Sequence, residues 1–533
     1  MENAAGQLNF TTIDTVIVVV YFLAVLAIGL RISRNTKTGE DLFLAGRNLG
    51  WVAIGFSLFA SNISSTTLIG LVGAAYTGGL YVSNYEWMAT VVLVFFVFFY
   101  VPIFLNTRIS TIPEYLEKRF GRASRKYMSG LTIITNLFVD TAGSLYAGAV
   151  VLIAFFPELD LFYTCVGLAL VAGLYTAAGG LAAVVYTDVI QAVVLIAGSI
   201  LLTFMVFSHP NVDWSWSTIT GSLDGSLFSM VDPAHHPLDD KNLPWLGTLI
   251  GVPILGFYFW VTNQYIVQRV LGARSVDDAR WGALLGGLLK LPVLFIMVLP
   301  GLVARLIDLD LPPDFQSDAI FPALVTQLLP VGVVGLVMAG LIAAIMSSID
   351  STLNSSSALI TLDFVKPARP NMTDKEVTRV GRIAMGVIMI LAALWAPQIA
   401  KFEGLFAYLQ LLLSYLVPPM TVLFIMGVFF KGGSGHTAMY TMVGGHLLSI
   451  GIFVAQRLGW LPEIHFTLIA GIVFGASLLI YLATRHVGQP RSDAELQELM
   501  KQPLEPGRPG LANYKLQAAV LIVLTLTLVV GFF

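Results

Sequence analysis

Residues 57–70 read Ser-Leu-Phe-Ala-Ser-Asn-Ile-Ser-Ser-Thr-Thr-Leu-Ile-Gly and place a polar cluster inside an apolar run long enough to cross a bilayer. Unpaired polar groups are costly at that depth, so this pattern is not typical of a plain membrane anchor. It predicts a helix that unwinds partway, because freed backbone is tolerated where it lines a cavity and can bind a cation. The alternative interpretation is a seam of small residues that packs against another helix.

Composition places the chain among polytopic membrane proteins. Its 533 residues are 56% hydrophobic and only 11% charged, and the mean hydropathy is +0.81. The one cysteine, Cys165, excludes an intrachain disulfide and a cysteine metal cluster. The first apolar run is as long as a span and is followed by basic residues, so we expect a membrane helix there and not a cleaved signal peptide.

Apolar runs of spanning length predict about fourteen transmembrane helices. They cover residues 13–33, 49–76, 80–105, 128–155, 160–178, 184–208, 246–268, 281–304, 323–362, 383–400, 403–430, 437–456, 464–484 and 513–533. The run at 323–362 is too long for one span, so we expect it to continue as helix into a loop.

Basic residues indicate how the chain is oriented. Of the 29 lysines and arginines, 24 fall in alternate loops, in groups such as Arg31 to Arg47 and Arg269 to Arg280. Loops of this kind face the cytoplasm. We therefore expect a multi-pass protein of the plasma membrane, in contact with bilayer lipid, with both termini outside.

Five ionisable residues fall inside the predicted spans: Glu86, Asp140, Asp188, Lys290 and Asp350. Glu86 and Lys290 occupy corresponding positions if the chain contains two inverted repeats of five spans, an arrangement that places substrate near the midplane. A carboxylate that accepts and an ammonium that donates could then grip the hydroxyl groups of a neutral polar solute. The alternative is a structural ion pair that joins two helices.

This repeat divides the chain into five expected regions. They are an extra N-terminal helix with the first inner loop at 1–48, the first repeat at 49–208, an outer loop at 209–245, the second repeat at 246–430, and three C-terminal helices at 431–533. The expected fold is an all-α polytopic membrane protein with a five-plus-five inverted-repeat core.

The segment 343–354 carries a second polar group. Helical spacing places Ser347, Asp350 and Ser351 on one face, with Ser348 beside them and the Ala344 carbonyl one turn back. Hydroxyl and carbonyl oxygens without a cage of acids suit a sodium ion that must bind reversibly. Alternatively, these serines only bond to their own backbone.

Several ordered motifs resemble the sodium/solute symporter family, and within it the sodium/glucose and sodium/galactose cotransporters. The resemblance covers nearly the whole chain and rests on motifs at 57–64, 85–87, 111–121, 175–181, 186–191, 264–269, 347–355 and 415–419. It implies a LeuT-like fold with one extra leading helix, the five-plus-five inverted repeat and trailing helices, in agreement with the count of fourteen.

The resemblance also implies ion sites. The main sodium site would use backbone carbonyls of Ala60, Ile63 and Ala344 with the hydroxyls of Ser347 and Ser348. A second cation site, present in some members, would use Asp188, Asp350 and Ser351 together with Ser347. Position 350 frequently carries a hydroxyl residue in the family, so with Asp350 this site could differ in affinity or bind a proton.

The substrate site implied by the resemblance comprises Asn62, Thr67, Glu86, Lys290, Gln410 and Trp260, with Phe259 and Phe406 as gates. Two positions depart from the family pattern. Thr67 stands where well-known sugar members carry His or Gln, and Phe259 stands where the inner gate is usually Tyr. Asp140 could add an acceptor for a hydroxyl or a cation, or could pair two helices.

The resulting expectation is a secondary active transporter that couples inward sodium flow to uptake of a glucose- or galactose-like sugar by alternating access. The alternatives are a sodium symporter for an inositol, sialic acid, a carboxylate or an amino acid such as proline, or else a channel or sensor. Enzyme chemistry is not expected, because none of the seven histidines forms a nucleophile or metal motif. No cofactor beyond sodium as the coupling ion and no nucleic-acid partner are expected.

Overall fold

The computed structural model describes residues 11–33, 37–63, 65–230, 243–311, 315–402, 405–501 and 509–532. Within its helices the side chains of a few residues, Phe406 among them, lie outside that description. The described residues form helices joined by turns, with one isolated β-bridge between Leu49 and Ala273. The all-α expectation is confirmed for this part of the chain.

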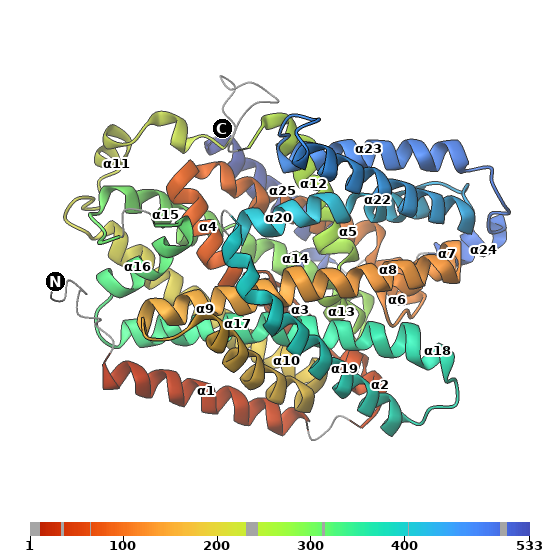
Figure 1. The fold of residues 1–533 in the computed structure, drawn as a ribbon, viewed down its shortest axis with the longest axis horizontal. Coiled ribbons are helices and arrows are strands. Elements are labelled where there is room, and N and C mark those ends of the chain that lie inside the picture. Colours follow the sequence, from red (N-terminus) through yellow and green to blue (C-terminus); the bar gives the residue numbers. More distant parts are fainter. Residues whose placement is uncertain are drawn as a thin grey trace.

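The described residues contain 25 α-helices, from three residues to several turns long, which are joined by turns, short 3-10 or π segments and longer loops (Figure 1). In chain order they are α1 (Thr12–Ser33), α2 (Gly39–Leu44), α3 (Trp51–Asn62), α4 (Ser65–Gly78), α5 (Asn84–Phe99), α6 (Val101–Asn106), α7 (Ile112–Phe120), α8 (Arg122–Thr135), α9 (Ala142–Phe155), α10 (Leu161–Phe207), α11 (Trp216–Ser222), α12 (Trp245–Phe257), α13 (Gln264–Leu271), α14 (Val276–Lys290), α15 (Leu299–Val303), α16 (Ile320–Leu328), α17 (Val333–Ala358), α18 (Lys366–Ala368), α19 (Asp374–Trp395), α20 (Leu405–Leu416), α21 (Pro418–Phe429), α22 (Gly435–Arg457), α23 (Phe466–Thr484), α24 (Asp493–Leu499) and α25 (Tyr514–Gly531).

Among the described residues, 11 helices are long and apolar enough to cross a membrane. Two further pairs qualify only together, because each is broken and bent: α3 with α4 by 54°, and α20 with α21 by 50°. A shorter apolar helix spans Leu161–Leu170. The multi-pass architecture and the break after residue 62 are therefore confirmed, while the exact count of fourteen stays a prediction.

Two boundaries differ from the sequence expectation. The long apolar run at 323–362 is divided between α16 and α17, because Pro330 cannot continue a helix and Gly332 has a φ of +85°. Spans expected at 160–178 and 184–208 are both part of α10, which kinks at Gly180 with a φ of +62°. A side chain at Gly180 would meet the backbone of Leu42 at 3.0 Å, so this close approach also favours glycine.

The centre of the molecule is occupied by α17, which packs against α1, α3, α10, α13 and α19 (Figure 1). Next to it, α3 packs along α14, and glycines allow a close approach of the two helices. A Cβ at Gly55 would lie 2.6 Å from Leu285, and a Cβ at Gly282 would lie 2.6 Å from Ile54. The polar break of α3 is consequently held between α14 and α17.

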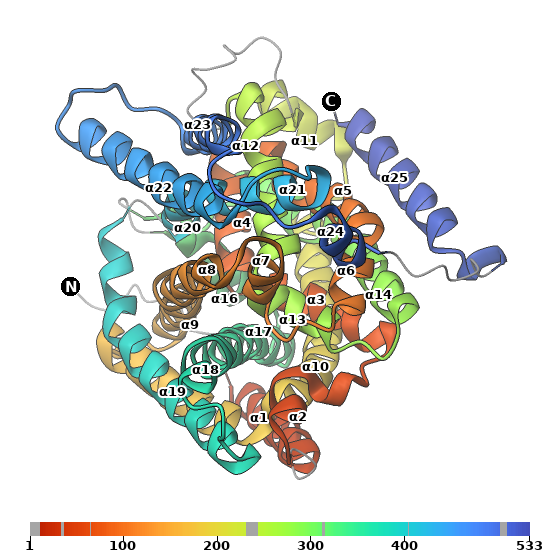
Figure 2. The same ribbon diagram turned by 90° about the vertical axis from the view of Figure 1, so that its right-hand side faces the viewer.

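The last helices lie at the periphery. Figure 2 shows α25 at one edge of the molecule, packed beside α5 and α14, and α22 paired with α23 at another edge. Large apolar side chains of α25 are exposed, such as Val523 and Val530, as expected for a surface that faces lipid. The division into repeats and C-terminal helices at the residues given above stays a prediction.

Candidate functional site

The break between α3 and α4 leaves polar backbone groups near the middle of a span. Helix α3 ends at Asn62, and Ile63 departs from helical geometry with φ −81° and ψ 71°. The last carbonyls of a helix have no intrahelical partner, and those of Ala60 and Ile63 belong to this turn. The hydroxyl of Thr67 donates to the Asn62 carbonyl oxygen at 2.7 Å and bridges the break.

A buried ion pair lies beside this break. Lys290 is the last residue of α14, and its ammonium contacts the Glu86 carboxylate on α5 and the Asn62 side-chain carbonyl. Lys290 is 1% exposed and Glu86 8%. The structure thus brings together the two charges that the sequence pattern paired, and it adds Asn62 as the group that joins them to α3.

A cavity of about 150 Å³ opens next to the ion pair. Six residues that the sequence assigns to the substrate site or its gates line it: Asn62, Thr67, Glu86, Phe259, Trp260 and Gln410. Lys290 is not among the lining residues and lies behind Glu86 and Asn62, which it holds in place. The remaining gate residue, Phe406, belongs to α20, but its side chain lies outside the described residues.

Other residues of the cavity lining are aromatic or acidic. Phe259 packs edge-on against Trp260 and Tyr265, with ring centroids 5.1 and 5.9 Å apart. Asp140 and Tyr265 both line the cavity, and their side chains interact with each other. One carboxylate oxygen of Asp140 has no hydrogen-bond partner among the described residues. The cavity therefore offers acceptors from both Glu86 and Asp140.

Residues of the expected sodium face lie where α17 meets the end of α3. The Ser61 hydroxyl is 3.3 Å from the Ser351 hydroxyl, so the two helices touch here. Ser348 lines the cavity, and its hydroxyl donates to the Ala344 carbonyl at 2.9 Å. This is the backbone bond that the alternative interpretation expects, and it leaves the hydroxyl lone pairs for a cation.

Asp188 lies in a fully buried polar cluster on α10. It accepts hydrogen bonds from Ser57 at 2.5 Å, from Ser61 at 3.3 Å and from Ser347. The guanidinium of Arg269 is 3.5 Å from the same carboxylate. The cluster therefore already contains one positive charge.

Three arginines of the basic groups that the sequence assigns to inner loops are in fact buried: Arg119 and Arg269 fully, and Arg280 with 5% exposure. Arg269 is 0% exposed on α13, and Arg119 is 0% exposed on α7. Arg119 donates to carbonyls that follow α21, such as Phe430 at 2.8 Å. Both terminal nitrogens of Arg269 donate to protein acceptors, whereas its Nε has no hydrogen-bond partner among the described residues. Asp350 is also fully buried, and its place in a second cation site stays a prediction.

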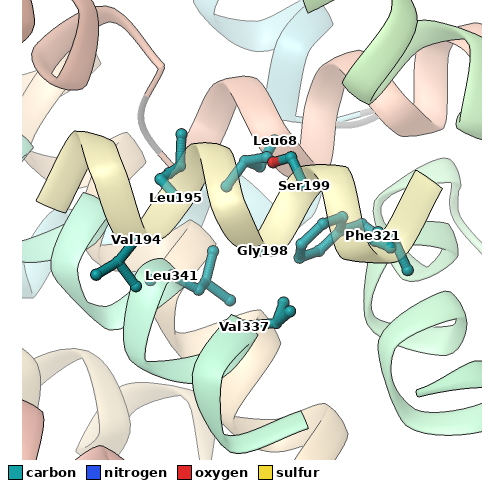
Figure 3. A pocket seen from close by; sticks show the side chains of 10 residues that line it. Leu68, Val194, Leu195, Gly198, Ser199, Phe321, Val337 and Leu341 are labelled. Atoms are coloured by element: carbon teal, nitrogen blue, oxygen red, sulfur yellow. The ribbon is translucent and has the colours of Figure 1, made fainter. Parts of the chain in front are cut away.

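A second cavity, of about 10 Å³, lies between α4, α10, α16 and α17 (Figure 3). Leu68, Leu195, Phe321 and Val337 make its lining mostly apolar, with Ser199 as its hydroxyl-bearing residue. It has room for about one water molecule. Of these two, the cavity beside Glu86 is therefore the better candidate for a solute. A larger pocket of about 540 Å³ lies between α14 and α25, but its described lining residues are mostly apolar and include no charged side chain.

A family model described as the sodium:solute symporter family matches residues 42–445. The chain belongs to this family. It is accordingly a sodium-coupled solute symporter, a multi-pass membrane transporter and not an enzyme.

Curated relatives of this symporter cover most of its length. It is 34% identical to the sodium/glucose cotransporter of Vibrio parahaemolyticus, over 89% of this chain and 91% of that one. It is 34% identical to sodium/glucose cotransporter 4 of Danio rerio, over 93% and 82% of the two chains. It is 36% identical to human sodium/myo-inositol cotransporter 2, over 82% and 69%.

Solved structures share the symporter's fold. A sodium-coupled sialic acid symporter in a substrate-bound, outward-open state superposes with a TM-score of 0.79, over 90% of this chain and 99% of that one, at 24% identity. A transporter of the nucleobase-cation-symport-1 family gives a TM-score of 0.55 at 14% identity, over 87% and 98%. At these identities the likeness concerns the fold alone.

The sequence interpretation did not single out Arg269, Ser57, Ser61 or Tyr265 as site residues. A signal was present for Arg269, which follows Gln268 inside the apolar run Tyr-Ile-Val-Gln-Arg-Val-Leu at 265–271. Two adjacent polar side chains flanked by apolar residues indicate a buried polar contact more than a solvated loop.

Proposed function

We propose that this symporter carries a sugar of the glucose or galactose type. The observation that supports the proposal is the Glu86–Lys290–Asn62 group at the wall of the cavity. A carboxylate and two amide side chains, those of Asn62 and Gln410, offer acceptors and donors to the hydroxyl groups of a neutral solute. Trp260 supplies an apolar surface beside them, which is typical of pockets that bind small polyhydroxy molecules with a few directed hydrogen bonds.

In this proposal, sodium binds at the break between α3 and α4. The carbonyls of Ala60, Ile63 and Ala344 and the hydroxyls of Ser347 and Ser348 are the proposed ligands of the coupling ion. Sodium would draw the end of α3 against α17 and thereby fix Asn62 in the cavity wall. Because binding is reciprocal, the solute must raise sodium affinity by the same factor. One charge that crosses 100 mV contributes about 2.3 kcal/mol to accumulation.

A polyhydroxylated ring without an anomeric centre is the second candidate. Human sodium/myo-inositol cotransporter 2 shares 36% identity with this chain. Thr67 and Phe259 depart from the pattern of well-known sugar members, and both line the cavity. An inositol would use the same acceptors and donors, so only direct competition between solutes separates the two candidates.

The test is uptake into proteoliposomes that contain the purified protein. Radiolabelled glucose, galactose, myo-inositol, sialic acid and proline are offered under an inward sodium gradient and, separately, under an equal potassium gradient. Sodium-dependent, saturable accumulation of glucose or galactose above equilibrium would support the proposal. Preferential accumulation of myo-inositol would favour the second candidate, and accumulation of sialic acid or proline would contradict both.

We also propose that the protein resides in the plasma membrane with both termini outside. The distribution of basic residues supports this orientation. Cys165 is buried, so a cysteine introduced next to either terminus would be the accessible thiol in intact cells. Labelling of that thiol by a membrane-impermeant maleimide would support the orientation, and protection until the cells are opened would contradict it.

A further inference from the structure

One buried side chain links the expected sodium face to the substrate cavity. Arg269 lies on α13 one turn after Tyr265, and Tyr265 lines the cavity. The guanidinium is fully buried, and its Nη2 donates to the Tyr265 carbonyl at 2.8 Å. Helix α13 therefore carries a wall of the cavity and a buried cation on successive turns.

The same guanidinium holds the helix that breaks. Nη1 of Arg269 donates to the Ser57 carbonyl at 2.6 Å and to the Ser57 hydroxyl at 3.0 Å, and it also contacts the Ser61 hydroxyl. Ser61 directly precedes Asn62, whose side chain binds Lys290 at the cavity wall. A movement at the end of α3 must therefore change the hydrogen bonds of Arg269.

A third set of contacts reaches the proposed sodium ligands. Nη2 of Arg269 donates to the Ser351 hydroxyl on α17 at 3.1 Å, and Nη1 lies 3.5 Å from Asp188 on α10. Asp188 in turn accepts a hydrogen bond from Ser347. A serine hydroxyl that donates its proton keeps its lone pairs for a cation. Asp188 thus orients Ser347 for sodium, and Arg269 holds Asp188.

We propose that Arg269 is a positioning residue that couples sodium binding to the shape of the solute cavity. Its planar fork of donors is bound at once by α3, α17, the carboxylate on α10 and its own helix α13. These elements can move relative to one another only by exchanging hydrogen bonds at this guanidinium. The inference rests on the proposed main sodium site, and it does not depend on which solute fills the cavity.

A purely structural role makes a different prediction. If Arg269 only neutralised Asp188, its replacement would weaken folding and sodium binding together. Any variant protein that still folded and bound sodium would then show the normal change of the cavity on sodium binding. A coupling role predicts that sodium still binds but that the cavity no longer responds. The two effects must be measured separately, because spatial position between two sites does not by itself demonstrate coupling.

The test uses the full-length protein carrying Cys165→Ser and Leu413→Cys, so that one thiol reports on the cavity, which Leu413 lines. The rate of its reaction with N-ethylmaleimide is measured in sodium and in potassium at equal ionic strength. Equilibrium binding of radioactive sodium is measured on the same samples. We expect sodium to change the reaction rate of this parent protein by about fivefold or more.

Adding Arg269→Gln should bring the ratio of the two rates close to one, while sodium affinity changes by less than about threefold. Arg269→Lys keeps the charge but not the fork, and it should give an intermediate ratio. The proposal is overturned if Arg269→Gln keeps the full response, if it loses sodium binding together with the response, or if the parent does not respond to sodium.

Two further variants keep the test decisive. If Arg269→Gln does not yield folded protein, Ser351→Ala removes one acceptor of the guanidinium. It should lower the sodium response of the thiol by about twofold or more, and an unchanged response would overturn the proposal. Ser348→Ala tests the main sodium site itself, since the Ser348 hydroxyl donates to the Ala344 carbonyl of its own helix. Unchanged sodium binding by Ser348→Ala would mean that the proposed main sodium site is wrong, whatever the role of Arg269.

Discussion

Among the residues that the structure describes, two ion pairs are buried on both sides, Lys290–Glu86 and Arg269–Asp188, and their surroundings differ. Lys290 and Glu86 meet at the wall of the cavity, where the Glu86 side chain is 10% exposed. Asp188 and Arg269 are both 0% exposed and are surrounded by hydroxyl and carbonyl groups of the protein. A solute in the cavity can therefore reach Glu86 of the first pair, which Lys290 holds from behind, but neither member of the second pair.

Because their surroundings differ, we expect the two ion pairs to have different roles. Charges removed from water are tolerated only when partners satisfy them, and the enclosed pair has fixed protein partners. Glu86, which lines the cavity, can in contrast accept a hydrogen bond from a solute hydroxyl while Lys290 holds it from behind. We therefore expect substitutions in the enclosed pair to act on folding and coupling, and substitutions in the cavity pair to act on solute uptake.

The largest effect should come from breaking the enclosed pair on one side. Asp188→Ala leaves the Arg269 guanidinium buried without a carboxylate, which costs about 3–5 kcal/mol. We expect a strong loss of folded protein and a lower apparent melting temperature in detergent, measured by heating followed by fluorescence-detected size exclusion.

The matched control for that change removes both charges. Asp188→Asn combined with Arg269→Gln should recover much of the folded protein, because no unpaired charge remains buried. If Asp188→Ala alone unfolds at the temperature of the unmodified protein, the enclosed pair does not stabilise the fold. That result would contradict the proposed difference between the two ion pairs.

The next effect concerns the cavity pair. Glu86→Gln removes the carboxylate that Lys290 holds and should reduce solute uptake by about a hundredfold, because truncating one partner of a buried charge pair costs about 2–5 kcal/mol. Sodium binding should change little, and the melting temperature should fall less than in Asp188→Ala, because the Glu86 side chain lies at the cavity and is 10% exposed. Initial rates in proteoliposomes and equilibrium sodium binding measure the two sides separately.

A control for Glu86→Gln is available in the same cavity. Ser144 also lines it, but its hydroxyl donates to the Asp140 carbonyl of its own helix at 2.8 Å. Ser144→Ala should therefore lower uptake by less than about threefold. Normal uptake by Glu86→Gln, or an equal loss in both variants, would remove the special role of the ion pair.

A smaller effect is expected at the proposed sodium ligand that touches the enclosed pair. Ser347→Ala removes a hydroxyl that is oriented by Asp188 and should raise the sodium concentration for half-maximal uptake by about tenfold, or about 1.4 kcal/mol. Preference among solutes should stay the same. Ser357→Ala is the control on the same helix, because Ser357 bonds to the Gly381 carbonyl at 2.8 Å instead. An unchanged sodium requirement in Ser347→Ala would argue against this ligand.

The sequence predicted one ion pair and not the other, for a physical reason. Glu86 and Lys290 lie inside apolar runs, where any charge is conspicuous. Arg269 lies near the end of an apolar run, and there a basic residue is typical of a loop that faces the cytoplasm. Hydropathy cannot distinguish a loop cation from a cation whose acceptors come from distant helices, because Ser57 and Ser351 are remote from it in sequence.

Local pattern likewise predicted the break of α3 but not its partners. Hydroxyl and amide residues at 61–67 interrupt an apolar span, and the structure bends there by 54°. The contact of Asn62 with Lys290 joins residues 228 positions apart. Pairings of this kind depend on the close packing of α3 on α14, which rests on tertiary contacts at Gly55 and Gly282.

The smallest predicted effect, that of Thr67→Val, tests whether Thr67 acts on the solute directly or through Asn62. Thr67 donates to the Asn62 carbonyl at 2.7 Å across the break, so Thr67→Val removes one hydrogen bond without changing the volume of the side chain. One such bond contributes about 1 kcal/mol, which predicts about a fivefold loss of uptake with normal sodium binding. Thr67→Ser keeps the hydroxyl and should retain uptake. A loss as large as that of Glu86→Gln would instead mean that the Thr67 hydroxyl, which lines the cavity, binds the solute itself.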